Sequence, residues 1–269
     1  MGIPRLMAAA GRLGVHFTFY LNLGYTFNWR HTLRHVARKQ LRRVAARPPG
    51  PPSLPTLAKL GTAGVFETML LNPRLGTRFR ATFDRLFEAG HELGLHGGTD
   101  HALWQRALPD LSEEQLEDLL RPAYQSFRRD YGKPRGFASP GFRYDDRVLH
   151  LTDSYGFEYG SDMSGDSPFR PRVGGRELTH YQVPVNVAGE GTVPLVEQML
   201  ALGRDDGEIV KAAADAIRGR SFALMYGHPF VEGVRADLIE RIVREVEDTH
   251  EVVTVGEYLA RWRECHDLR

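Results

Sequence analysis

The sequence has very few cysteines: Cys265, almost at the C-terminus of 269 residues, is the only one. No disulfide can therefore form within the chain, so the disulfide frameworks of small secreted domains are excluded. No apolar run approaches the ~20 residues needed to cross a bilayer. Residues 6–24 are fairly apolar, but Arg12 and His16 interrupt them, and the pattern of a signal peptide is missing. We therefore expect a cytoplasmic protein, with peripheral attachment to the inner membrane face as an open alternative.

Acidic residues are missing from the first 66 positions, whereas ten Lys or Arg occur there. The rest of the chain holds 25 basic and 34 acidic residues, so the net charge of +1 conceals two oppositely charged parts. Seven of the ten basic residues lie between Arg30 and Arg47. Such a run is typical of a transit peptide or of a basic surface for an anionic partner. Because sequence of a folded type flanks the run on both sides, we favour the basic surface.

Short β-prone runs alternate with helical patterns along the chain. The predicted strands are residues 16–21, 92–96, 136–139, 157–161, 181–185, 222–226 and 252–255. The predicted helices are residues 4–13, 78–89, 112–131, 145–155, 207–218 and 234–249. Ser112 and Gln115 precede an apolar run and so predict a capping box at a helix start. The alternation predicts an α/β domain with a mainly parallel sheet, and the number of units favours one barrel over residues 1–269.

The strongest local pattern is Gly-His-Glu-Leu-Gly-Leu-His-Gly-Gly-Thr-Asp-His at residues 90–101. A helical zinc-protease motif needs two histidines four residues apart, whereas His91 and His96 are five apart and would point to opposite sides of a strand. A strand that ends at His96, followed by a glycine loop, would instead bring His96 and His101 together as ligands of one divalent metal. The alternative is that both are surface histidines and that Asp100 caps a helix beginning near residue 102.

Further polar residues follow other predicted strands. An apolar run ends in His228, which is either a core histidine bonded to a carbonyl or a general acid or base at the barrel mouth. Glu232, four residues later, is placed to orient it. The loop around Gly141 and Arg143 offers backbone N–H groups for an oxyanion, and Asp162 follows another strand. In a barrel these strand ends meet at one face, which is where active sites lie.

Taken in order, these segments resemble the polysaccharide deacetylase (NodB-like) carbohydrate esterases. The resemblance extends from residue 2 to about Tyr258 and is carried by residues 90–96, 100–105, 159–162, 169–171, 182–185, 228 and 231–233. Within the family, the sequence looks most like the branch that deformylates a lipid-linked formamido sugar. The resemblance implies a distorted TIM-type (β/α)7 barrel. It also implies hydrolysis of an N-acetyl or N-formyl group on an amino sugar, with a lipid-phosphate-linked sugar as one candidate substrate.

The resemblance also implies roles for individual residues. His96 and His101 would bind a divalent metal, usually zinc in the family, and His228 would protonate the leaving amine. The backbone N–H near Gly141 would face the oxyanion. Four further residues are expected at the site: Asp100 as a substitute metal ligand or base, and Arg143, Asp162 and Glu232 on the substrate side.

The sequence departs from the family pattern in three places. The family spaces its two ligand histidines four residues apart, and its third motif carries an arginine that is replaced around Ala138. Its metal-binding and base aspartates lie on a first strand before the helix that begins near Pro4, whereas the first acid in this sequence is Glu67. We therefore expect a barrel lacking that strand and an impaired activity. The alternative function is a pseudoenzyme that binds carbohydrate or a lipid-linked sugar.

The basic segment at about residues 28–48 has its own pattern. Trp29, Leu33, Val36, Leu41 and Val44 recur at roughly helical spacing, with the basic residues mostly on the other side. The pattern suits a solvated helix face and equally a helix lying on an anionic membrane. No aromatic or glycine-rich interleaving supports nucleic-acid binding, so a nucleic-acid partner is not expected.

Overall fold

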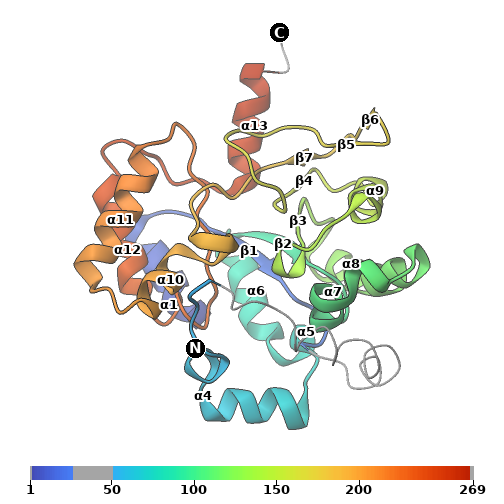
Figure 1. Cartoon of the computed structure of the whole chain (residues 1–269), viewed down its shortest axis with the longest axis horizontal. Helices are drawn as coiled ribbons and strands as arrows, with labels where there is room; N and C mark the ends of the chain where they lie inside the picture. The colour runs from blue at the N-terminus through green and yellow to red at the C-terminus, as the bar shows by residue number, and fades with distance from the viewer. Residues whose placement is uncertain (1, 27–50, 267–269) are drawn as a thin grey trace.

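A parallel sheet of five strands forms the centre of the computed structural model, which describes residues 2–26 and 51–266 (Figure 1). The strands are β1 (Thr18–Leu21), β2 (Glu92–His96), β3 (Gly136–Ala138), β4 (Tyr159–Gly160) and β7 (Tyr181–Gln182), in the order β1-β2-β3-β4-β7. Each neighbouring pair is parallel, so all five strands end at the same edge of the sheet. β5 (Arg172–Val173) and β6 (Arg176–Glu177) form a separate antiparallel pair.

Helices flank the sheet on two sides. One group comprises α5 (Leu75–Arg78), α6 (Arg80–Glu88), α7 (His101–Ala107), α8 (Glu113–Tyr131) and α9 (Asp146–Ser154). The other comprises α1 (Gly2–Leu13), α10 (Leu195–Ala201), α11 (Asp206–Arg218) and α12 (Ala236–Val246), which lie together in Figure 1. α13 (Val255–His266) carries the C-terminal end of the described chain. The peripheral α4 (Thr56–Phe66), which is kinked at Gly61, continues into the π-helix η1 (Glu67–Leu71). Short 3-10 turns complete the chain: η2 (Leu108–Asp110), η3 (Pro140–Phe142) and η4 (Glu190–Thr192).

Four apolar clusters form the core, and the two largest hold most of the helices in place. The larger contains Leu95 of β2 and Phe137 of β3 packed with Trp104 of α7 and Leu116 of α8, all four fully or almost fully buried. The second joins α10, α11 and α12, with Leu238 as one of its fully buried members. The sheet edge that carries the polar loops is therefore supported by packed helices on both sides.

Most predicted elements are confirmed. All six predicted helices form, and α8 begins with the predicted capping box: Ser112 Oγ accepts from Gln115 N at 3.2 Å, and Gln115 Oε1 accepts from Ser112 N at 2.9 Å. The parallel α/β class is confirmed as well. Within residues 2–26 and 51–266 the strand ladders run from β1 to β7 without joining the ends of the sheet.

Two strand predictions are wrong. Residues 222–226 lie beside Asn186, whose side chain takes backbone groups that a neighbouring strand would otherwise bind. It donates to Phe222 O and accepts from Leu224 N, both at 2.8 Å. Only an isolated bridge between Val187 and Met225 remains. Residues 252–254 form no strand, and α13 starts at Val255, because side chains take the backbone donors there: Thr18 Oγ1 accepts from Val255 N at 2.9 Å.

No described helix is long and apolar enough to span a membrane. The basic segment at about residues 28–48 lies outside the described residues, so its predicted helix stays a prediction.

Candidate metal and acid–base site

His96 and His101 come together at the end of β2. His96 pairs with Ala138 in the sheet, and its Nδ1 lies 2.9 Å from the Ala138 carbonyl oxygen. The chain then turns through Gly97 at a φ of 64°, where an added Cβ would lie 2.5 Å from Pro140 Cγ. A side chain at this position would be both strained and obstructed. Glycine therefore lets α7 start immediately and place His101 beside His96.

The two rings face each other through their Nε2 atoms, which are 3.2 Å apart. Two nitrogens bound to one tetrahedral zinc ion at 2.0–2.1 Å would be about 3.3 Å apart. The hydrogen bond from His96 Nδ1–H to the Ala138 carbonyl leaves the Nε2 lone pair for a ligand, which is how metal-binding histidines are commonly oriented. The pair thus fits two ligands of a divalent cation.

The pKa values of His96 and His101 also favour a role as metal ligands. Burial, together with the nearby charges of His101 and His228, lowers the pKa of His96 to about 3. Burial also lowers the pKa of His101 to about 4, with contributions from the charges of His228 and Arg106. Both rings are therefore neutral at pH 7, the form that binds metals.

His91 does not take part in this pair. His91 lies just before β2 begins, at the opposite end of the strand from His96. Its Nδ1 accepts a hydrogen bond from Phe17 N at 3.1 Å. Since residues 92–96 form a strand, the exclusion of a helical zinc-protease motif is confirmed.

Asp100 has the geometry of a helix cap. It is the N-cap residue of α7, is 1% exposed, and accepts from Leu103 N at 3.0 Å. This is the alternative that the sequence left open for it. Among the described residues, no group of three His, Cys, Asp or Glu side chains could hold a metal ion, so neither Asp100 nor Glu232 joins the histidine pair as a third ligand.

His228 is held at its backbone and at its ring. Its backbone N–H donates to Glu232 Oε2 at 2.6 Å, so Glu232 contacts the backbone of this residue. Its ring stacks on Phe230 with the centroids 4.9 Å apart, and its Nδ1 lies 3.5 Å from Glu197 Oε2. The charge of His228 contributes to the lowered pKa of both His96 and His101, so the three histidines share one region.

Glu197 is a site residue that the sequence prediction missed. It lies on α10, is 1% exposed, and also pairs with Lys59 Nζ at 2.6 Å. Burial alone would raise the pKa of Glu197, but its interactions with His228 and Lys59 lower the pKa overall. A lone acid in the apolar run Leu-Val-Glu-Gln-Met-Leu at residues 195–200 is a signal that could have drawn attention to it.

The remaining predicted residues lie in the loop after β3, as Gly141 and Arg143 do, or contact that loop, as Asp162 does. Gly141 is exposed at a φ of 62°, and an added Cβ would lie 2.5 Å from Gln105 Nε2. Arg143 is exposed, and its carbonyl oxygen accepts from Trp104 Nε1 at 3.0 Å. Phe142 packs edge-on against Tyr226 with the centroids 5.1 Å apart, which brings this loop next to the His228 segment.

Asp162 lies deeper than a substrate-facing residue. It is 5% exposed, and its Oδ1 accepts from Ser139 N at 2.5 Å. Ser139 follows Ala138, whose carbonyl holds the His96 ring. Asp162 therefore supports the loop that orients His96.

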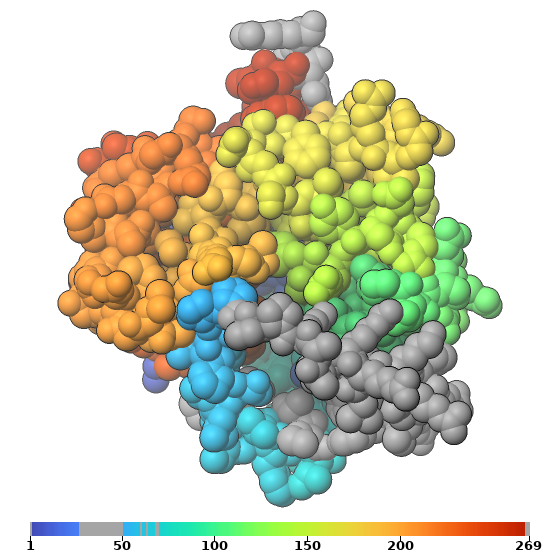
Figure 2. All heavy atoms as spheres, in the orientation of Figure 1, coloured from blue at the N-terminus to red at the C-terminus, as the bar shows by residue number. Residues whose placement is uncertain are grey.

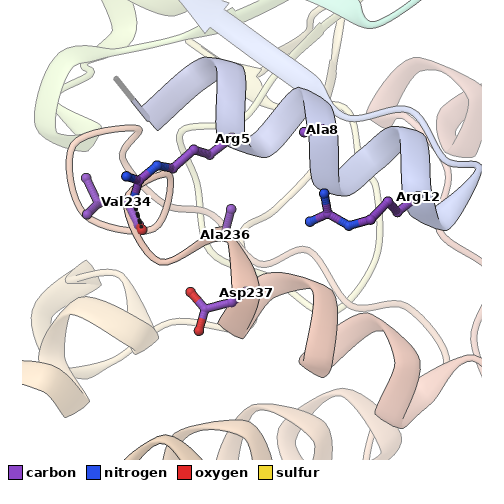
Figure 3. A pocket seen from close by; sticks show the side chains of 6 residues that line it. All are labelled: Arg5, Ala8, Arg12, Val234, Ala236 and Asp237. Atoms are coloured by element: carbon purple, nitrogen blue, oxygen red, sulfur yellow. Dashed lines mark hydrogen bonds between the residues drawn. The ribbon is translucent and has the colours of Figure 1, made fainter.

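The cavity shown in Figure 3 lies elsewhere, between α1 and the start of α12. It has a volume of about 210 Å³ and is lined by Arg5, Ala8, Arg12, Val234, Ala236 and Asp237. Arg5 Nη1 donates to Val234 O at 2.9 Å, and Arg12 pairs with Glu240 at 2.7 Å. Both guanidinium groups are thus engaged within the protein.

Comparison with solved structures identifies the fold. A protein from Mycobacterium smegmatis, described as a polysaccharide deacetylase, superposes with a TM-score of 0.62 over 98% of this chain and 77% of its own, at 19% identity. A pseudoenzyme of carbohydrate esterase family 4 from Bacillus anthracis superposes with a TM-score of 0.52 over 95% of this chain and 59% of its own, at 14% identity. The fold is that of the polysaccharide deacetylases.

Sequence comparison points to one branch of this class. The chain is 26% identical over 257 residues to a Shewanella sediminis protein named as a 4-deoxy-4-formamido-L-arabinose-phosphoundecaprenol deformylase, covering 93% of this chain and 77% of that protein. No family model matches the chain. The resemblance predicted from the sequence, to the polysaccharide deacetylases and to the lipid-linked deformylase among them, is therefore confirmed.

Proposed function

We propose that the protein is a hydrolase that removes an N-acetyl or N-formyl group from an amino sugar with the help of a divalent metal. One observation carries the proposal: His96 Nε2 and His101 Nε2 lie 3.2 Å apart at the strand-end edge of the sheet, with His228 in the same region. The relationship to a deformylase and to polysaccharide deacetylases supports a carbon–nitrogen bond of a sugar amide as the target.

The chain's residues have distinct tasks in this proposal. A bound divalent ion, with zinc as the first candidate because both ligands are imidazoles, would lower the pKa of water and polarise the amide carbonyl. His96 and His101 would hold that ion. The ring of His228 carries a proton for the leaving amine, which must be neutralised as the carbon–nitrogen bond breaks. The backbone N–H of Gly141, an exposed residue of the loop after β3, would donate to the carbonyl oxygen as charge develops on it.

A lipid-linked sugar and an anionic membrane surface are the finer part of the proposal. The deformylase relative is named for a phosphoundecaprenol-linked substrate. α4 and η1 expose four large apolar side chains, Leu57, Phe66, Leu70 and Leu71, each at least 57% exposed. These elements lie at one edge of the molecule (Figures 1 and 2). In the sequence they come after the seven basic residues between Arg30 and Arg47, from which residues 48–55 separate them. Exposed apolar groups on elements that follow a basic run in the sequence suit peripheral attachment to anionic lipid.

A pseudoenzyme that binds a carbohydrate or a lipid-linked sugar is the second candidate function. The specific observation that favours it is that the described residues supply two metal ligands and no third. A pseudoenzyme is also among the proteins of similar fold. Under this alternative the site would bind sugar without hydrolysing the amide.

Metal titration and hydrolysis assays test the proposal together. Wild type should bind one Co²⁺ or Zn²⁺ per chain, and the variant His96→Ala/His101→Ala should lose that binding. His150→Ala, an exposed histidine on α9, is the matched control and should bind as wild type does.

Metal-loaded wild type should release formate or acetate from N-acylated amino sugars, and His228→Ala should lower kcat by about 10²–10⁴-fold. Unchanged metal affinity in the double alanine variant would refute the ligand assignment. Metal and sugar binding without any product would favour the pseudoenzyme.

A further inference from the structure

Lys59 reaches the site from outside the sheet. It lies in the first turn of α4, where its backbone N–H donates to Pro55 O at 3.0 Å. Its Nζ contacts Glu197 Oε1 at 2.6 Å, and the other oxygen of the same carboxylate, Oε2, lies 3.5 Å from His228 Nδ1. The Glu197 side chain is 1% exposed. One buried carboxylate therefore joins a peripheral helix to the histidine proposed as the acid.

The two contacts on Glu197 have different consequences. A buried carboxylate is costly unless it is paired, so the Lys59 ammonium stabilises Glu197 as an anion in this position. Glu197 Oε2 lies within ion-pairing distance of Nδ1 on one side of the His228 ring, at 3.5 Å, and Nε2 is the other ring nitrogen, available to a ligand. The backbone of His228 is held separately by Glu232, at 2.6 Å. Ring orientation and backbone position are thus set by two different acids.

The start of α4 is itself anchored beside α10. A Cβ added at Gly191, in the turn η4 before α10, would lie 2.8 Å from Pro51 Cγ, so the chain leading into α4 packs closely on this turn. Lys59 follows within the next eight residues and approaches Glu197 from the same side. The salt bridge therefore comes from a segment packed in place and not from an isolated flexible side chain.

We propose that Lys59 is a positioning residue for His228, acting through Glu197: it holds the carboxylate that in turn holds the His228 ring. The proposal rests on the proposed function to the extent that His228 acts as the acid. Loss of Lys59 would leave the carboxylate free to rotate or to take up a proton, and the ring would lose its fixed partner at Nδ1.

The test compares Lys59→Met with Lys59→Arg, which keeps the cation, in the full-length protein. Lys211→Met is the matched control, because Lys211 forms an exposed salt bridge with Asp215 at 2.6 Å on α11. In the metal-loaded enzyme, Lys59→Met should lower kcat roughly tenfold, a part of the 10²–10⁴-fold that acid–base catalysis supplies, with KM changed less than twofold. Lys59→Arg should restore most of kcat, and Lys211→Met should behave as wild type.

A second readout does not depend on activity. The ring nitrogen and proton signals of His228 in NMR spectra of the metal-free protein should shift in Lys59→Met as they do in Glu197→Gln, and should stay near their wild-type positions in Lys59→Arg. If Lys59→Met lowers only the thermal stability and leaves both kcat and the His228 signals unchanged, Lys59 has a structural role and the proposal is overturned. If wild type hydrolyses no substrate, the proposed function fails, while the NMR comparison still decides the role of Lys59.

Discussion

Replacing Asp162 by Asn should change how the stability of the protein depends on pH. The side chain is buried, and Oδ1 accepts from Ser139 N at 2.5 Å. Burial raises the pKa of Asp162 from its ordinary 3.8 to about 7, although the hydrogen bond from Ser139 opposes that rise. Asn keeps the acceptor oxygen for Ser139 and cannot ionise, so the substitution removes the titration while preserving the contact.

The sign and size of the effect follow from the raised pKa. The folded protein holds the proton of Asp162 more tightly than the unfolded chain does. The stabilisation that the protonated carboxyl provides is therefore complete below about pH 4, where both states are protonated. That stabilisation is lost as the pH rises through about 7. The difference between 3.8 and about 7 corresponds in total to on the order of 4 kcal/mol. Integrated between pH 5 and pH 8, about 2.5 kcal/mol of it disappears.

Urea unfolding of wild type and Asp162→Asn at pH 5 and pH 8, in the presence of a chelator, measures this directly. The free energy of unfolding of the variant, relative to wild type, should increase by about 2.5 kcal/mol from pH 5 to pH 8. Asp118→Asn, at a side chain that is 67% exposed, is the control and should show no such trend. Parallel stability curves for wild type and Asp162→Asn would show that the carboxylate is not held in a desolvated site and would refute the reasoning.

Three further predictions concern the fold and the membrane. Leu95→Ala on β2, at a position that is fully buried, should lower the free energy of unfolding by about 2–5 kcal/mol in urea titrations, and a loss below 1 kcal/mol would contradict the packing described. Ser112→Ala removes half of the capping box of α8 and should cost about 1 kcal/mol in the same assay, with the exposed Ser154→Ala as a comparison. Sedimentation with vesicles should show binding to anionic but not to neutral lipid, because each basic residue near an anionic surface contributes about 1 kcal/mol. Added salt should weaken this binding. Equal binding to both lipids would exclude the role proposed for the run from Arg30 to Arg47.

Local patterns predicted much of the fold because their causes are local. The capping box at Ser112 is a contact between residues three apart, and β2 forms where the sequence has a short β-prone run. The same logic failed at residues 222–226, which have the composition of a strand. There a distant side chain, Asn186, makes the hydrogen bonds that a neighbouring strand would otherwise make.

The histidines show how much of the candidate site can be predicted from the sequence. The spacing of His96 and His101 around two glycines predicted their proximity, because five residues and a positive-φ glycine suffice to turn the chain back. The spacing of His228 and Glu232 likewise predicted their contact within one turn. Asp162 was predicted near the site, but the sequence did not show that its carboxylate accepts a hydrogen bond from the Ser139 backbone N–H.

The sequence by itself therefore determined the α/β class, the positions of the main helices and sheet strands, and the pairs of residues that lie within one loop. Only the tertiary structure decided which distant groups meet. Lys59, Glu197 and His228 lie on three segments far apart in the chain, and none of the three has a local partner that reveals the others. Their contact arises because the chain leading into the peripheral α4 packs against the turn before α10, which brings one cation to a buried carboxylate. The cost of burying a charge makes them pair.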